Sequence, residues 1–143
     1  MKIGELAKIA KCSAETIRFY EKEGLLPPAA RTDNNYREYQ QSHLERLRFI
    51  RNCRAFDMSH EEIRQLLLQV DSHADDCQTV NILLDEHILH IEHRIQELMN
   101  LKGQLQTLRQ QCQQQQGIDE CGIVQGLTNL ELTHHSERHT HLG

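Results

Sequence analysis

The fold is decided by residues 3–24, which read IGELAKIAKCSAETIRFYEKEG. Apolar residues recur at helical spacing from Ile3 to Ala10, so this stretch predicts a first short helix. Ser13 then stands where an N-cap would begin a second helix, and Gly24 stands where that helix would end. Two short helices joined by a tight turn predict a helix-turn-helix unit.

The residues that follow predict a small hairpin and two more short helices. Within residues 32–40, Asp33-Asn34-Asn35 lies between residues that can pair as strands. The segments Ser42-His-Leu-Glu45 and Ser59-His-Glu-Glu62 both match the capping box that begins a helix, and apolar residues at helical spacing follow each. Residues 1–70 are therefore expected to form a winged helix-turn-helix domain, and residues 71–76 a polar linker.

A long helix is predicted over residues 77–112, a stretch without proline and with one glycine. Its apolar seam advances in steps of three and four residues, with one residue missing from the heptad rhythm near the middle. A single helix cannot bury such a seam, so it needs a partner helix, most simply its own copy; packing against the N-terminal domain is the alternative. The seam consists of Leu84, Ile88, Ile91, Ile95, Leu98, Leu101, Leu105, Leu108 and Cys112.

Composition favours a mainly α protein with its nucleic-acid face near the N-terminus. Only 4% of the 143 residues are aromatic, and the chain has 7 Gly and 2 Pro. Residues 1–60 contain 11 Lys and Arg against 8 Asp and Glu, a net charge of +3, whereas residues 61–143 carry −8. No run approaches the roughly 18 apolar residues needed to cross a bilayer, so a cytoplasmic location is expected.

Two groups of side chains in the N-terminal domain have the chemistry of DNA contacts. Arginine and lysine neutralise phosphates or address guanine edges, and the hydroxyls of threonine and tyrosine fix the register on the backbone. The expected second helix carries Thr16, Arg18, Tyr20 and Lys22 along its more polar side, and the expected wing carries Arg31, Tyr36, Arg37 and Tyr39.

Five short motifs, in this order and spacing, resemble the N-terminal domain of the MerR family. They are Ile3-Gly-Glu-Leu-Ala7, Glu15-Thr-Ile-Arg-Phe-Tyr-Glu21, Gly24-Leu-Leu26, Asn35-Tyr-Arg-Glu-Tyr39 and Leu47-Arg-Phe-Ile50. The resemblance covers roughly residues 1–125 and implies a winged helix-turn-helix followed by a long antiparallel coiled-coil dimerisation helix. It also implies a homodimer that binds promoter DNA and distorts it so that RNA polymerase can start. The DNA contacts that it implies are Thr16, Arg18, Tyr20, Tyr36, Arg37 and Tyr39.

Cys77, Cys112 and Cys121 are the candidate metal ligands. A continuous helix from Cys77 to Cys112 would separate its ends by about 50 Å at about 1.5 Å per residue, so one chain cannot bring both sulfurs to one ion. An antiparallel dimer can, because it places Cys77 of one subunit beside Cys112 and Cys121 of the other. Three soft sulfurs suit a thiophilic ion. Residues 112–130 are expected to form the metal-binding loop and a short helix.

The segments Leu83-Leu-Asp-Glu-His-Ile88 and Leu108-Arg-Gln-Gln-Cys112 resemble the cadmium- and lead-responsive branch of the family. The effector expected from this resemblance is a divalent heavy-metal ion, cadmium or lead first, with zinc or mercury as alternatives. The remaining cysteines, Cys12 and Cys53, are interpreted as small buried hydrophobes.

The C-terminal residues 131–143 are histidine-rich and expected to be a flexible tail. His134, His135, His139 and His141 form a possible second metal site, because dense imidazoles bind borderline metals. Two other functions remain open. A thiol redox sensor on the same scaffold would form a disulfide, whereas a metalloenzyme has little support because no hydrolase metal motif, phosphate loop or nucleophile elbow is present.

Overall fold

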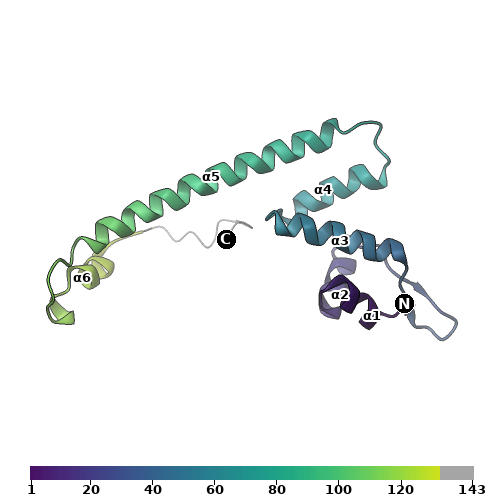
Figure 1. Cartoon of the computed structure of the whole chain (residues 1–143), viewed down its shortest axis with the longest axis horizontal. Helices are drawn as coiled ribbons and strands as arrows, with labels where there is room; N and C mark the ends of the chain where they lie inside the picture. The colour runs from purple at the N-terminus through teal and green to yellow at the C-terminus, as the bar shows by residue number, and fades with distance from the viewer. Residues whose placement is uncertain (133–143) are drawn as a thin grey trace. The chain divides into compact units, whose positions relative to one another are not determined.

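The structure is a computed structural model that describes residues 1–132, and the helices predominate in it, as predicted (Figure 1). Contacts divide the chain into a first unit, Met1–Leu84, and a second unit, Asp85–Gly143. In chain order the elements are α1 (Ile3–Ala10), α2 (Ala14–Lys22), β1 (Ala30–Arg31), β2 (Arg37–Glu38), α3 (Gln41–Ala55), α4 (His60–Asp71), α5 (Gln78–Arg109), the 3-10 helix η1 (Ile118–Glu120) and α6 (Gly122–Asn129).

Helices α1 and α2 form the predicted helix-turn-helix, and the turn between them is set by two end signals. Lys11 adopts the left-handed conformation (φ 56°) that ends α1, and the N–H of Cys12 donates to the carbonyl of Ala7 at 3.0 Å. Ser13 is the N-cap of α2, where its hydroxyl oxygen accepts from the backbone N–H of Thr16 at 3.1 Å. The N-cap at Ser13 was predicted from the sequence, whereas the left-handed conformation of Lys11 was not.

The wing is a two-stranded antiparallel hairpin in which Ala30 lies opposite Glu38. Its turn is closed by the N–H of Thr32, which donates to the carbonyl of Tyr36 at 2.7 Å, and Asn35 takes the left-handed conformation (φ 64°). Asparagine tolerates this conformation better than most residues, which explains why Asp33-Asn34-Asn35 forms the turn.

Two apolar clusters hold the first unit together. The first cluster joins α1 and α2 to the start of α3, and the second joins the end of α3 to α4. Tyr20 packs against both clusters and so connects them. The first consists of Leu6, Ala7, Ala10, Ile17, Leu26, Tyr39, Leu44 and Leu47, and the second of Leu25, Ile50, Cys53, Met58, Ile63, Leu66 and Leu67.

The predicted start of α3 is wrong by two residues, whereas the predicted start of α4 is right. The N-cap of α3 is Gln40, whose N–H donates to the Nδ1 of His43 at 3.0 Å, and Ser42 already lies inside the helix. In α4 the capping box forms as expected: the N–H of Ser59 donates to Glu62 at 2.9 Å, and the N–H of Glu62 donates to the Ser59 hydroxyl at 3.1 Å. At the start of α3 the imidazole nitrogen of His43 thus takes the role that a glutamate carboxylate has in the capping-box motif. The motif therefore did not predict this N-cap.

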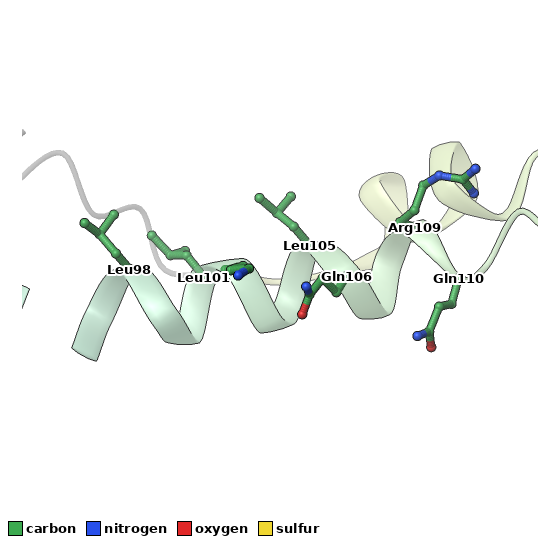
Figure 2. A pocket seen from close by; sticks show the side chains of 7 residues that line it. Leu98, Leu101, Leu105, Gln106, Arg109 and Gln110 are labelled. Carbon is green, nitrogen blue, oxygen red and sulfur yellow. The ribbon is translucent and has the colours of Figure 1, made fainter. Parts of the chain in front are cut away.

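Helix α5 is continuous over 32 residues and presents much of its apolar seam to solvent within the single chain, whereas Leu108 of the seam is buried. The side chains of Leu84, Ile88, Ile95, Leu98 and Leu105 are all exposed. Figure 2 shows Leu98, Leu101 and Leu105 beside a groove of about 960 Å³ along this helix. No helix among residues 1–132 combines the length and the apolarity that a membrane span requires.

The predicted end of α5 is too late, because the helix stops at Arg109 and leaves Cys112 in the following loop. Backbone N–H groups of the following residues satisfy carbonyls of its last turn: Gln111 donates to Leu108 at 3.1 Å, and Cys112 donates to Arg109 at 3.4 Å. The Arg109 guanidinium donates to the carbonyl of Cys112 at 2.8 Å, and the Gln113 amide donates to the carbonyl of Gln110 at 2.7 Å. The helix therefore ends in a backbone turn, and the side chains of Arg109 and Gln113 hold the loop that follows it.

The two serines test the observed helix starts. We expect Ser59→Ala to lower the free energy of unfolding by about 1 kcal/mol, because it removes the N-cap acceptor of α4. Ser42→Ala is the matched control and should change it by less than about 0.5 kcal/mol, because Ser42 is exposed inside α3. Urea unfolding followed by circular dichroism at one protein concentration measures both. An equal loss in the two variants would mean that α3 begins at Ser42.

Candidate nucleic-acid interface and metal centre

A basic groove joins α2 to the wing in the first unit. It has a volume of about 310 Å³ and is lined by Lys2, Ile3, Arg18, Arg31, Asn35, Tyr36 and Arg37. The predicted residues Arg18, Tyr36 and Arg37 therefore lie together, although α2 and the hairpin are separate in the chain. Four cationic side chains and a phenol around one hollow have the chemistry that recognises a phosphate backbone.

Glu21, near the end of α2, holds the wing in place. Its carboxylate accepts a hydrogen bond from the Tyr39 hydroxyl and lies 3.4 Å from the Arg37 guanidinium. The Glu21 side chain is only 10% exposed, whereas that of Arg37 is 41% exposed, so the carboxylate is shielded and the guanidinium remains open to solvent. Burial, and then the hydrogen bond to Glu21, raise the pKa of Tyr39, which keeps this phenol protonated as a donor. Glu21 thereby sets the position of Arg37 relative to α2.

The structure corrects the role of Tyr39 and separates Thr16 and Tyr20 from the groove. Tyr39 is 1% exposed, so its ring belongs to the core and we remove it from the proposed DNA contacts. Thr16 and Tyr20 line a different hollow of about 120 Å³, and the hydroxyl of Thr16 lies 2.8 Å from that of Ser13. Burial raises the pKa of the Tyr20 phenol, which is half-buried in the structure.

Sequence reasoning missed Lys2, Arg51 and Arg54. The ammonium of Lys2 lies 5.4 Å from the centre of the Tyr36 ring, within the range of a cation–π interaction. Lys2 lies beside the wing because the N–H of Tyr39 donates to the carbonyl of Met1 at 2.7 Å. These two residues are far apart in the chain, so no local sequence pattern predicts the bond. Arg51 and Arg54 line the hollow of Thr16. Their positions on α3 could have been noted as a basic face at helical spacing.

The second candidate site is a pair of thiols, Cys112 and Cys121, at the end of α5. Cys112 follows the end of that helix, and Cys121 is the N-cap of α6. The thiol of Cys121 is the main reason why the pKa of Cys112 is raised, and the Sγ of Cys112 donates to the carbonyl of Gln114 at 3.6 Å. The backbone N–H groups of Val124 and Ile123 point to the Cys121 sulfur and lower the pKa of its thiol. The start of α6 therefore favours thiolate, the form that binds metal.

Cys77 lies at the other end of α5, immediately before its first residue, and its side chain is exposed. The N–H of Asn81 donates to the carbonyl of Cys77 at 2.9 Å, so Cys77 occupies the N-terminal end of the helix as expected. The 32 residues of α5 span about 48 Å at about 1.5 Å per residue. One chain thus offers two of the three predicted ligands at one end of the helix and the third at the other.

The remaining cysteines have the environment of packing residues. Cys53 is buried in the second apolar cluster, and Cys12 packs against the first. Burial raises the pKa of both thiols, which disfavours thiolate and metal binding. The histidines of the predicted second metal site, His134, His135, His139 and His141, lie outside the described residues.

Paired sulfurs with backbone N–H donors beside them fit a soft metal ion and not a hard one. The donor set would be completed by one more soft ligand, because three or four ligands are usual for such ions. Exposed Cys77 is available to supply it to another chain. One chain thus offers a pair of neighbouring thiols at this site, and one further ligand would have to come from elsewhere.

Two family models match the chain. One, described as MerR HTH family regulatory protein, matches residues 1–70, and the other, described as MerR, DNA binding, matches residues 44–108. Together they cover the helix-turn-helix, the wing and most of α5.

Known proteins are similar over most of the chain. The HTH-type transcriptional regulator ZntR homolog of Haemophilus influenzae is 46% identical over 110 residues, which cover 77% of this chain and 82% of that protein. The regulator PbrR691 of Ralstonia metallidurans CH34, solved in complex with lead(II), is 48% identical with a TM-score of 0.81 and coverage of 89% and 98%. MerR of Bacillus megaterium MB1, solved with mercury(II), is 29% identical with a TM-score of 0.70 and coverage of 90% and 99%.

Arg18 is the residue of α2 whose loss should affect the basic groove most directly. We expect Arg18→Ala to weaken binding to duplex DNA by about 1–3 kcal/mol, because it removes a cation that faces the groove. Arg48→Ala removes the same charge from an exposed position on α3 outside the groove and should change the affinity much less. Fluorescence anisotropy with a labelled promoter fragment compares the variants at one salt concentration. Equal affinities for Arg18→Ala and the parent would exclude Arg18 from the interface.

Proposed function

Because the chain belongs to the MerR family of helix-turn-helix transcription regulators, we propose that Cys77, Cys112 and Cys121 bind the metal ion to which it responds. The chain is a metal-responsive transcription regulator. We assign cadmium or lead as its effector first, and zinc or mercury after them. The lead(II) complex of PbrR691, at 48% identity, supports this order.

The observation that carries the proposal is that Cys112 and Cys121 adjoin the close contact between Gln111 and Gly122, beside the first turn of α6. Two sulfurs already adjacent in the apo chain lose little freedom when an ion binds them, so the pair is preorganised. Helix α5 prevents Cys77 of the same chain from joining them, because it is continuous between Cys77 and the loop of Cys112.

A homodimer supplies the third ligand in this proposal. The exposed apolar residues of α5 need a partner helix, and a second copy in antiparallel orientation buries the same seam on both chains. In that arrangement the partner subunit's Cys77 approaches Cys112 and Cys121. Each dimer then holds two equivalent three-sulfur sites, and metal binding is linked to the geometry of the dimer.

The DNA end of the proposed dimer consists of two basic grooves, one on each subunit. Arg18, Tyr36 and Arg37 would contact the backbone on either side of a promoter, with Thr16 and Tyr20 as further proposed contacts. Metal binding would favour a protein state that bends and untwists the promoter so that RNA polymerase can start. Deforming a short duplex requires about 1–6 kcal/mol, which differential metal affinity between two protein states can supply. The target genes would encode heavy-metal resistance functions. The regulator itself would act in the cytoplasm.

Redox sensing is the second candidate, and the proximity of Cys112 to Cys121 is the observation that favours it. Two adjacent thiols can also form a disulfide, and a thiolate is the attacking species in that reaction. A redox sensor would respond to an oxidant without metal. The metalloenzyme alternative gains no support from the named relatives, which are transcription regulators.

Complementation between two inactive variants tests the shared site. We expect Cys77→Ser homodimers and Cys112→Ser/Cys121→Ser homodimers each to bind cadmium poorly, because every site lacks at least one sulfur. In a heterodimer one site has all three cysteines and the other has none. One tight cadmium site per purified heterodimer is therefore expected in a titration against a chromophoric chelator.

The outcome separates three models of the metal site. Heterodimers that bind no better than either parent variant exclude a site shared between subunits. Full cadmium affinity in the Cys77→Ser homodimer would mean that Cys112 and Cys121 suffice. Induction by an oxidant in metal-free buffer, together with a disulfide in the parent chain, would favour the redox sensor.

Removal of the histidine-rich tail tests whether it is needed. We expect a chain that ends at Leu132 to activate transcription in response to cadmium as the full chain does, because the proposed ligands all precede that residue. A promoter reporter with graded cadmium measures the response. Complete loss of induction would make His134, His135, His139 and His141 part of the sensory site.

A further inference from the structure

The N-terminal end of α6 lies in backbone contact with the loop that ends α5. A Cβ atom placed on Gly122 would overlap the carbonyl oxygen of Gln111, and it would lie 3.1 Å from the carbonyl carbon and 3.2 Å from the Gln111 Cβ. The nearest obstacle is backbone, which cannot rotate away as a flexible side chain can. Any residue with a Cβ at position 122 must therefore move α6 away from this loop.

Helix formation alone does not explain a glycine here. Glycine destabilises a helix interior by about 1 kcal/mol relative to alanine, and α6 is only eight residues long. Gly126 lies one turn later on the same face, and a Cβ there would meet the Gln111 Oε1 at 2.6 Å and the Leu108 Cδ1 at 2.9 Å. One face of α6 thus lacks side chains where it meets the end of α5.

The contact lies next to both thiols in the chain. Gln111 immediately precedes Cys112, and Gly122 immediately follows Cys121. Contact between Gln111 and Gly122 therefore brings the two cysteines side by side, and it also directs the first backbone N–H groups of α6 toward Cys121. We propose that Gly122 is a positioning residue for the Cys112–Cys121 pair: its lack of a side chain allows the backbone contact that holds the two sulfurs together. The assignment of the pair as a metal site rests on the proposed function, whereas the positioning itself does not.

Gly117 provides a matched control in the same loop. It has φ −63°, which alanine adopts without strain, and a Cβ there would meet no atom within 4 Å. Gly117→Ala and Gly122→Ala both add one methyl group to a glycine. Only the methyl group at position 122 would clash with Gln111. Gly126→Ala is a graded case, because its first obstacle is the far end of a flexible glutamine side chain.

The first measurement needs no metal. In a background with Cys12, Cys53 and Cys77 changed to serine, diamide oxidises the two thiols of Cys112 and Cys121 to a disulfide and takes up their hydrogens. We expect Gly122→Ala to slow this reaction at least about tenfold relative to the parent, and Gly117→Ala to leave its rate within about twofold. An unchanged rate in Gly122→Ala would overturn the proposal.

The second measurement uses cadmium in the otherwise natural chain. Changes in groups that orient metal ligands typically lower metal affinity about 10–100-fold, and we expect a loss in this range for Gly122→Ala but not for Gly117→Ala. Binding of the apo variants to duplex DNA should equal that of the parent, which excludes general unfolding as the cause. If Gly122→Ala retains the cadmium affinity of the parent, the positioning role is wrong.

The side chain of Gln111 distinguishes the two glycines. Gln111→Ala should restore the disulfide rate of Gly126→Ala at least in part, because it removes the Oε1 obstacle. It should not restore Gly122→Ala, because the obstacle there is the backbone carbonyl; rescue of that variant would overturn the assignment of the contact. If the parent chain forms the disulfide rapidly but binds no cadmium, the proposed metal function fails while the positioning role stands.

Discussion

The length of an unbroken helix is the constraint on which the proposed function depends. Helix α5 has 32 residues and no internal break, so its ends are about 48 Å apart whatever the rest of the chain does. That distance separates Cys77 from the pair Cys112 and Cys121, and it leaves an apolar seam without cover in one chain. A second chain in the opposite direction removes both difficulties at once. In the proposed function, metal binding and dimerisation are therefore linked by geometry.

Each of the two units is organised by one short contact between residues that are separated in the chain. In the first unit the buried carboxylate of Glu21 receives the Tyr39 hydroxyl and attracts Arg37, so the wing is fixed to α2. In the second unit Gly122 lies against the carbonyl of Gln111, so α6 is fixed to the end of α5. The Glu21 carboxylate and Gly122 are not themselves proposed to meet DNA or metal, but each fixes a neighbour that is: Arg37 in the first unit, and Cys121 in the second.

Local signals in the sequence predicted most of the fold, and contacts between distant residues account for what they missed. Ser13, Ser59 and the Asp33-Asn34-Asn35 turn act through their immediate neighbours, and each was read correctly. Tyr39 was assigned to the DNA contacts because the resemblance implied it, but the core of α1, α2 and α3 takes up its ring. The end of α5 was placed three residues late, because the backbone turn after Arg109 and the loop bonds of Arg109 and Gln113 follow no motif.

The pairing of Arg37 with Glu21 alters how the basic groove should respond to salt. Duplex DNA releases condensed counterions as protein cations replace them, and the slope of affinity against salt counts the charges that do so. Lys2, Arg18, Arg31 and Arg37 all line the groove, but Arg37 already shares its charge with a shielded carboxylate. Arg37 thus displaces less than one counterion's worth of charge. The ion pair therefore fixes the wing but weakens the nonspecific electrostatic attraction between the groove and DNA. A larger share of recognition is then left to shape and hydrogen bonding.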